Sequence, residues 1–342
     1  MAETASYPPI FDGHNDTILS LTRTGRSFFE RSTEGHIDLP RALEGRLGGG
    51  FYAMYVPPTQ SAQPPQVPAG PELVPAQSEL LSMFGRLLEI AQASTGRVRV
   101  VRTAAEIQAC LDGGTHAMLL HLEGAEPLDP EGRALEVFYA AGLRSVGLTH
   151  ARHNRYATGV PTRTFPSTPD IGPGLTDAGK ALVRQLNKRK VMIDLSHINE
   201  RGFWDVAAIT DAPLVATHSN AHARCRNPRN LTDKQLDAVR DNRGMVGLNF
   251  AIGFLREDGG RNPDTPIGTM VEHIDYMVER MGIDHVGLGS DFDGTTVPAQ
   301  LKDAAGLPKL AAAIRARGYT DGDLLKLLHG NWLRVLRETW DG

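Results

Sequence analysis

The chain has 342 residues, of which 41% are hydrophobic and 22% are charged, a composition typical of a globular protein with a sizeable core. Its formal net charge of −4 gives no electrostatic support for a nucleic acid or an anionic membrane as partner, and no apolar run reaches the roughly 18–20 residues of a membrane span. Cys110 and Cys225 are the only cysteines and the first residues lack a signal-peptide pattern, so we expect a cytoplasmic enzyme or binding protein without a disulfide framework.

Short segments rich in apolar and β-branched residues recur along the whole chain. They lack the alternation of half-exposed strands, and such patterns are typical of strands that are buried on both faces of a parallel sheet. The predicted strands are residues 8–16, 49–57, 117–124, 144–150, 191–197, 213–219, 244–250 and 284–293.

Helical patterns separate several of these segments. Residues 175–190 begin with a Thr–Asp capping signal and end in basic residues, and residues 265–282 place apolar side chains three or four positions apart before a glycine. The proline-rich residues 56–75 are interpreted as a long surface loop after the second strand. Residues 321–340 predict a helical tail that packs against the outside of the fold.

Eight strands that alternate with helices favour a (β/α)8 barrel, also called a TIM barrel. A doubly wound sheet is the alternative, but no GxGxxG turn follows the first predicted strand. We therefore predict one barrel domain over residues 1–342, with the C-terminal helical tail packed on it.

Polar side chains follow most of the predicted strands, at the point where each strand ends. Catalytic groups in barrels of this type lie at the C-terminal ends of the strands, so these side chains should share one rim. They are His14 and Asp16, Glu123, His150, His197, His218, and Asp291 with Asp293.

Several imidazoles and carboxylates at one barrel mouth favour a metal such as zinc, and there are too many of them for one tetrahedral ion. His14 and Asp16 lie two positions apart, on one face of a strand, and can bind one metal ion together. His197 and His218, at the ends of neighbouring strands, can bind a second ion. Glu123 lies between the two pairs around the barrel and can bridge both ions, which could then share a hydroxide nucleophile.

These residues occur in motifs that resemble, in order, the signatures of the membrane dipeptidase family, also called renal dipeptidase. The resemblance extends from about residue 9 to residue 336. The motifs are FDGHND (11–16), HLEG (121–124), LTH (148–150), IDLSH (193–197), THSNA (217–221), RN (229–230), GLGSDFDG (287–294) and GNWLRV (330–335). The resemblance implies a zinc-dependent dipeptidase on an amidohydrolase-type barrel that forms a homodimer. Bacterial members often prefer a D-amino acid at the C-terminal position of the dipeptide.

The resemblance also implies a role for individual residues. It assigns one zinc ion to His14, Asp16 and Glu123 and the other to Glu123, His197 and His218. It implies that His150 binds the substrate beside the scissile carbonyl. Arg229 would bind the free carboxylate of the dipeptide, and Asp291 would transfer the proton of the nucleophilic water to the leaving amine. The sequence departs from the family at one position. The family has a tyrosine that contacts the substrate after the NF dipeptide, whereas here Phe250 is followed by Ala251.

Other polar residues near the motifs have plainer interpretations. His121 lies two positions before Glu123, so it either contributes to the site from below or is a packed histidine. Asp12 is expected to hydrogen-bond the loop backbone rather than a metal. Asp293 is expected to support the metal ligands from behind or to stabilise a turn, rather than to bind the metal itself.

Two other functions remain open at this level. A different binuclear amidohydrolase, such as a lactonase, phosphotriesterase or deaminase, would often begin with an H-x-H motif and bridge its metals with a carboxylated lysine on the fourth strand. Here the first motif is H-x-D, from His14 to Asp16, and the fourth strand ends in His150. A non-catalytic barrel that binds a ligand is the third hypothesis.

Overall fold

The strands of the protein form a nearly closed barrel. The computed structural model describes residues 7–58 and 72–341. Within these residues, nine strands form one sheet with parallel pairing, and eight of them follow one another in the order β1-β2-β4-β5-β6-β7-β8-β9. At the seam between β9 and β1, the Asp16 amide donates to the Phe292 carbonyl at 2.8 Å and the Asp291 amide donates to the His14 carbonyl at 3.0 Å. The predicted (β/α)8 barrel is therefore confirmed.

Each of the eight predicted segments overlaps one barrel strand. The additional strand, β3, was not predicted and pairs with residues 116–119 of β4, below the part of β4 that pairs with β5. The strands are β1 (Ile10–Asn15), β2 (Leu47–Tyr55), β3 (Val98–Val101), β4 (His116–Glu123), β5 (Leu143–Gly147), β6 (Met192–Asp194), β7 (Val215–Ala216), β8 (Met245–Leu248) and β9 (Val286–Leu288).

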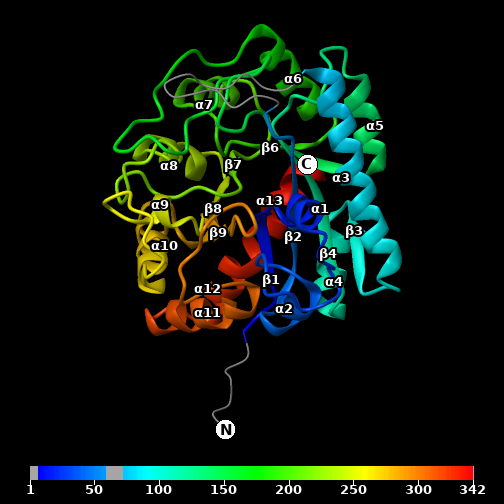
Figure 1. The fold of residues 1–342 in the computed structure, drawn as a ribbon. Helices are drawn as coiled ribbons and strands as arrows, with labels where there is room; N and C mark the ends of the chain where they lie inside the picture. Colours follow the sequence, from blue (N-terminus) through cyan, green and yellow to red (C-terminus); the bar gives the residue numbers. More distant parts are fainter. Residues whose placement is uncertain (1–6, 59–71, 342) are drawn as a thin grey trace.

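Helices surround the barrel, with α3 and α5 on one side and α8 to α10 on the other (Figure 1). The helices are α1 (Thr17–Thr24), α2 (Leu39–Glu44), α3 (Leu73–Ala93), α4 (Ala104–Gly113), α5 (Arg133–Ala141), α6 (Asp177–Lys188), α7 (Glu200–Ala207), α8 (Asp233–Asp241), α9 (Ile252–Leu255), α10 (Ile267–Met281), α11 (Leu307–Ala316), α12 (Asp321–Leu325) and α13 (Asn331–Trp340). Among the described residues, no helix combines the length and the apolar character that crossing a bilayer requires.

The two helices predicted from their caps and periodicity are both present. Before α6, the Thr176 side chain accepts a hydrogen bond from the Gly179 amide, which satisfies one of the free amides of the first turn. In α10, Met270, Ile274 and Met277 are buried at helical spacing and pack against the barrel.

The proline-rich loop ends earlier than the sequence pattern predicts. Of residues 56–75, positions 59–71 lie outside the described part of the chain, and Leu73 already begins α3. This helix buries Ala76, Leu80, Met83 and Leu87, which recur every three or four residues, so a helical pattern follows the prolines directly.

The C-terminal tail packs on the barrel, but it closes one end rather than covering the outside wall. Trp332 of α13 is fully buried, its ring centroid lies 5.0 Å from that of Phe51, and its indole nitrogen donates to the Leu288 carbonyl at 3.0 Å. A Cβ atom on Gly13 would lie 2.3 Å from the indole, so only glycine fits there. The cluster around Trp332 contains residues from strand beginnings, such as Met192 and Val215, and it therefore fills the end of the barrel opposite the predicted site.

Candidate metal centre

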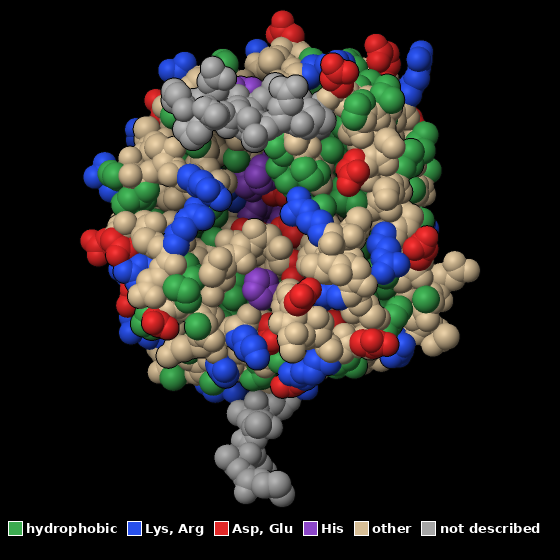
Figure 2. Space-filling view, viewed as in Figure 1, with side chains coloured by type: hydrophobic (Ala, Val, Ile, Leu, Met, Phe, Trp, Pro, Cys, Tyr) green, Lys and Arg blue, Asp and Glu red, His purple; other side chains and the backbone are tan. Residues whose placement is uncertain are grey.

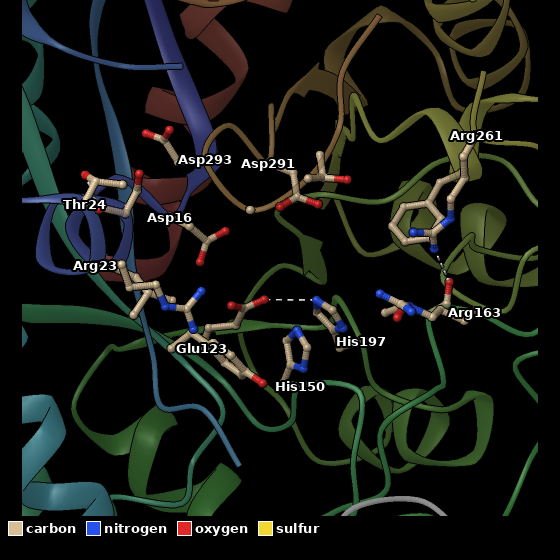
Figure 3. Close-up of a pocket in the computed structure, with 17 residues that line it drawn as sticks. Asp16, Arg23, Thr24, Glu123, His150, Arg163, His197, Arg261, Asp291 and Asp293 are labelled. Carbon is tan, nitrogen blue, oxygen red and sulfur yellow. Dashed lines mark hydrogen bonds and ion pairs between the residues drawn. The ribbon is translucent and has the colours of Figure 1, made fainter. Parts of the chain in front are cut away.

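A cavity of about 380 Å³ opens at the C-terminal ends of the strands. Figure 2 shows it as a hollow with histidine and acidic side chains inside and basic side chains on its rim. In Figure 3, Asp16, Glu123, His150, His197 and Asp291 lie around this cavity. The barrel thus brings side chains that are far apart in the sequence to one place.

Glu123 lies at the centre of the predicted ligands. Its Oε1 atom is 2.9 Å from Nε2 of His197, 3.6 Å from Nε2 of His218 and 3.7 Å from Nε2 of His14. The Nε2 atoms of His197 and His218 are 3.1 Å apart. A tetrahedral zinc ion with bonds of about 2.0–2.1 Å separates its ligand atoms by about 3.3 Å. The spacing of these donors is therefore close to that of a zinc site.

The second group of donors surrounds His14. Its Nε2 atom is 3.6 Å from Asp16, and donor atoms of His14, Asp16 and Asp291 all lie within 4.8 Å of one another. Donor atoms of Glu123, His150 and His197 also lie within 4.8 Å of one another. The cluster is thus larger than the five predicted ligands, because both His150 and Asp291 border it.

Several of these donors have no partner within the described residues. Both ring nitrogens of His14 are buried without a hydrogen bond, and its Nε2 atom faces Asp16 and Glu123. Nδ1 of His197 is also unpaired, although Nε2 is the nitrogen of that ring that faces Glu123. An unsatisfied buried polar atom is costly, and a bound cation removes that cost for a lone-pair donor. The residues present therefore fit a metal ion in both donor type and spacing.

The charge states of the histidines follow from burial and from the carboxylates. Burial holds the pKa of His197 and of His218 well below its usual range, which keeps both imidazoles neutral and able to ligate a metal. Burial also lowers the pKa of His14, but Glu123, Asp16 and Asp291 outweigh it and raise the pKa of His14 to about 10. Burial raises the pKa of Glu123 to about 8. A positive charge beside Glu123 is therefore strongly stabilised by the surrounding carboxylates.

Two of the site residues have an unusual backbone conformation. His197 and Asp291 have φ angles of 70° and 59°, in the left-handed region that non-glycine residues rarely adopt. Both lie in loops just beyond β6 and β9, whose short strands end before the residues that line the cavity. Such conformations cluster at functional sites, where the surrounding structure maintains them.

The ring of His150 lies between two other rings. Its centroid is 4.3 Å from that of Tyr55 and 4.3 Å from that of His197. The Tyr55 hydroxyl accepts a hydrogen bond from Arg152 at 3.0 Å, and Arg152 in turn pairs with Glu126 at 2.6 Å. Arg152 is therefore buried and engaged, and it supports Tyr55 from behind the site.

Arg229 lies just below the surface of the cavity and is 2% exposed. It donates to the His218 carbonyl at 3.0 Å and to the Ser219 hydroxyl at 3.4 Å. Its Nε atom has no hydrogen-bond partner among the described residues, and its guanidinium is 5.6 Å from the ring centroid of Phe254, which lines the cavity. A buried cation with a free donor is thus placed beside the candidate metal centre.

Asp291 faces the cavity and is oriented by a side chain that sequence reasoning did not identify. Asn249, at the end of β8, donates to Asp291 Oδ2 at 2.9 Å. Burial, together with the nearby Asp16, raises the pKa of Asp291 to about 6. Asn249 comes from the NF dipeptide that follows a strand, a signal that could have indicated it.

Asp12 has the plain role expected of it, whereas Asp293 and His121 have wider contacts. Asp12 accepts hydrogen bonds from the Ser290 amide and hydroxyl, both at 2.6 Å, across the seam of the barrel. Asp293 pairs with Arg26 at 2.9 Å and accepts a hydrogen bond from the His36 amide at 2.6 Å, so it joins the loop after β9 to residues 26–36. His121 lies below the metal centre, where Ser145 is its hydrogen-bond partner at 2.9 Å, and it offers a ligand atom within 4.8 Å of those of His14 and Asp194.

Other residues of the site were not identified from the sequence. Asp194 and Thr217 form a polar layer beneath His218, and Arg163 and Arg261 line the cavity mouth. A polar side chain inside an apolar strand could have indicated the first two. The arginines come from loops whose course has no sequence signal.

Comparison with known proteins shows which family the chain matches. The profile of a family described as membrane dipeptidase (peptidase family M19) matches residues 3–341. A dipeptidase, verJ, of Clonostachys rogersoniana is 31% identical over 342 residues, which cover 96% of this chain and 83% of that protein. An uncharacterized protein in the pqqA 5′ region of Klebsiella pneumoniae is 54% identical over 254 residues, which cover 74% of this chain and 93% of that protein.

A solved structure is similar to the whole chain. The crystal structure of a metallo peptidase from Rhodobacter sphaeroides, liganded with a phosphinate mimic of the dipeptide L-Ala-D-Ala, has a TM-score of 0.94 and 46% sequence identity. The similarity covers 98% of this chain and 100% of that chain. The fold of this chain is therefore that of the Rhodobacter sphaeroides metallo peptidase.

Proposed function

Because the chain belongs to the membrane dipeptidase family and is a metal-dependent dipeptidase, we propose that it uses two zinc ions to hydrolyse dipeptides with a C-terminal D-residue. Family membership argues against the lactonase, phosphotriesterase and deaminase alternatives, and against a barrel that only binds a ligand.

The central position of Glu123 is the observation that supports two metal ions. Its Oε1 atom lies within 3.7 Å of His14 on one side and within 3.6 Å of His218 on the other. We assign His14 and Asp16 to one ion, His197 and His218 to the other, and Glu123 to both. When bound, such a pair of zinc ions supplies a hydroxide nucleophile at neutral pH and polarises the scissile carbonyl.

Arg229 recognises the free carboxylate of the dipeptide. Its guanidinium has an unpartnered Nε donor beside the cavity, and charge-assisted hydrogen bonds to a carboxylate are strong where water is excluded. A longer peptide has an amide at this position and would leave the buried cation unpaired. Arg229 therefore selects dipeptides over longer chains.

His150 and Asp291 act on the reacting groups. The neutral imidazole of His150, fixed between Tyr55 and His197, is placed to hydrogen-bond the substrate carbonyl region. Asp291 has a carboxylate directed into the cavity and oriented by Asn249. It accepts the proton of the attacking water and delivers it to the departing amine nitrogen.

The proposed stereochemistry is supported by a relative. The Rhodobacter sphaeroides peptidase, 46% identical to this chain, was crystallised with a mimic of L-Ala-D-Ala. We extend that ligand class to this chain because the similarity covers 98% of its residues.

We also propose that the protein forms a homodimer. Val74, Leu81 and Leu88 are exposed hydrophobic side chains seven residues apart on α3, and they form a row on its outer face. Burial of such a row against a second copy would stabilise a dimer. Light scattering of the purified protein should give twice the chain mass of 37.1 kDa, and a monomer at all concentrations would contradict it.

We propose a cytoplasmic location as well. Cys110 and Cys225 are buried and unpaired, as expected in a reducing compartment. Fractionation of the native cells would test this, and recovery in an extracytoplasmic fraction would contradict it.

The central experiment combines metal analysis with a dipeptide panel. We expect protein purified without chelator to contain two zinc ions per chain and to hydrolyse L-Ala-D-Ala faster than L-Ala-L-Ala. Chelation should abolish hydrolysis, and added zinc should restore it. A fully active enzyme with a single metal ion per chain would contradict the binuclear proposal, and equal rates on both stereoisomers would contradict the preference for D-residues.

A further inference from the structure

A second cavity, of about 240 Å³, adjoins the one that contains the candidate metal centre. Thr162, Arg163 and Arg261 line both cavities, so they form the wall between the two. The other residues that line the side cavity are Phe165, Asn227, Gly253 and Gly259.

Positive charge predominates in the side cavity. The described residues that line it include two arginines and no aspartate or glutamate. Among the described residues, no carboxylate pairs with Arg163 or Arg261, and the recorded hydrogen bond of Arg261 is to the Thr162 carbonyl at 3.4 Å. By contrast, the nearby Arg256 pairs with Asp258. Two exposed guanidiniums are thus available to an incoming anion.

The side cavity also lies next to the residue proposed to bind the substrate carboxylate. Asn227, which lines it, accepts a hydrogen bond from the Arg229 amide at 3.0 Å. Gly253 lines it too, and the following residue, Phe254, packs against the Arg229 guanidinium. A dipeptide whose carboxylate contacts Arg229 would therefore have its C-terminal residue next to the side cavity, whose wall contains Arg163 and Arg261.

The opposite wall of the main cavity offers a comparison. Figure 3 shows Arg163 and Arg261 together on one side of the site and Arg23 on the other, beyond Asp16 and Glu123. Arg23 is exposed, lines the main cavity and does not line the side cavity. The arginines of the mouth are thus divided between two separate positions.

We propose that the side cavity is a subsite for an acidic side chain on the C-terminal residue of the substrate. The preferred substrates are then dipeptides that end in aspartate or glutamate, whose side-chain carboxylate binds Arg163 and Arg261. This inference rests on the proposed dipeptidase function and on the position assigned there to the substrate carboxylate. The pairing is of the guanidinium–carboxylate type, in which two parallel hydrogen bonds add geometric selectivity to the charge.

The test compares substrates that differ only in charge. We expect kcat/KM of the zinc-loaded enzyme to be about tenfold higher for L-Ala-D-Glu than for L-Ala-D-Gln, the gain of one or two partly exposed ion pairs. In the double variant Arg163→Met, Arg261→Met this ratio should fall to about one. The same comparison with L-Ala-L-Glu and L-Ala-L-Gln keeps the subsite testable if the proposed preference for D-residues is wrong.

Arg23→Met is the matched control, because it removes one exposed arginine of the same mouth. We expect it to keep the Glu-to-Gln ratio of the parent. If it lowers the ratio as much as the double variant does, the preference comes from the general positive field of the mouth, and the subsite is wrong. The single variants Arg163→Met and Arg261→Met, with their zinc contents and melting temperatures, exclude a loss caused by misfolding.

The failure of this inference is distinguishable from the failure of the proposed function. If the parent hydrolyses L-Ala-D-Ala but treats the Glu and Gln dipeptides alike, the enzyme is a dipeptidase and the acidic subsite is refuted. If the zinc-loaded parent hydrolyses no dipeptide of the panel, the proposed function itself is refuted.

Discussion

The hydroxyl of Thr217 lies 2.8 Å from Nδ1 of His218 and donates to the Asp194 carboxylate at 2.6 Å. Because the single hydroxyl hydrogen is directed at Asp194, the proton of the imidazole must be on Nδ1, where it donates to the threonine oxygen. The lone pair of His218 is then on Nε2, which faces Glu123. A chain of two hydrogen bonds thus sets the tautomer that a metal ligand requires.

This arrangement predicts that Thr217→Val weakens metal binding although valine has the same shape as threonine. The partners of ligating histidines typically change metal affinity by about 10–100-fold. Zinc affinity measured by competition with a chelator should fall by that factor, and Thr217→Ser, which keeps the hydroxyl, should restore most of it. Parent-like zinc affinity in the valine variant would show that His218 is oriented by other contacts.

Glu123→Gln should damage both metal sites at once. A carboxamide has only one oxygen and no negative charge, so it cannot bridge two cations as a carboxylate does. We expect the zinc content to fall below two per chain and turnover to collapse. His14→Ala is the comparison, since it should weaken one ion while the other remains. Two tightly bound zinc ions in the purified glutamine variant would refute the bridging role.

The barrel could be predicted because its strands are buried on both faces and therefore appear as short apolar runs. Even β7, only two residues long, lies within its predicted segment. The interior position of Trp332 could not be predicted, because an amphipathic helix looks the same whether it covers a wall or closes an end. The start of α3 was missed because prolines directly precede it, and β3 was missed because it has four residues, of which Arg99 is exposed.

The rim of polar side chains could be predicted because each one follows a strand, and parallel strands end at the same edge. The contacts that orient them could not. The hydrogen bond from Asn249 to Asp291 joins residues 42 positions apart, and the ring contact between Tyr55 and His150 joins the end of β2 to the loop after β5. Such pairs depend on the exact register of the barrel, which no single segment determines. Arg163 and Arg261 depend on loop conformations, which are even less constrained by local sequence.

Arg229→Met should raise KM for dipeptides and leave both zinc ions bound. Methionine fills much of the same volume but cannot pair with a carboxylate. The gap in kcat/KM between a dipeptide and its C-terminal amide should therefore narrow. Zinc content and melting temperature serve as controls, because Arg229 also donates to the His218 carbonyl. If the variant rejects the amide as strongly as the parent does, another residue binds the carboxylate. Arg163 would then be tested next, since Arg152 is already paired with Glu126.

The environment of His273 predicts that the free energy of unfolding falls in weak acid. Its Nδ1 accepts a hydrogen bond from the Ala221 amide and its Nε2 donates to the Leu255 carbonyl, so the folded protein requires the neutral ring. Burial lowers the pKa of His273 to about 4, whereas the unfolded chain has a value of about 6.5. Between these values the unfolded state binds the additional proton, so the stabilisation is complete above about pH 6.5 and is lost as the pH falls toward 4.

The loss from His273 should reach about 2 kcal/mol at pH 5. Urea unfolding of chelator-treated protein at pH 7 and pH 5 measures it without a contribution from bound metal. His273→Gln keeps one acceptor and one donor but does not titrate, so it should lose about 2 kcal/mol less than the parent between the two pH values. An equal loss in both proteins would show that other groups cause the acid sensitivity.

Asp291→Asn tests the proton transfer with little disturbance of the backbone. Asp291 has a φ angle of 59°, a conformation that asparagine tolerates better than most residues. The loop after β9 should therefore keep its position, while the side chain loses its ability to accept and release a proton. We expect kcat to fall by about 10²–10⁴-fold with little change in KM, the usual range for the loss of a general acid–base group.

Because donor atoms of Asp291 lie within 4.8 Å of those of His14 and Asp16, zinc content must be measured in the same preparation. A variant that retains both zinc ions and the parental kcat would exclude Asp291 as the proton carrier. A variant that loses zinc in proportion to its activity would instead assign Asp291 to the ligands of the ion bound by His14.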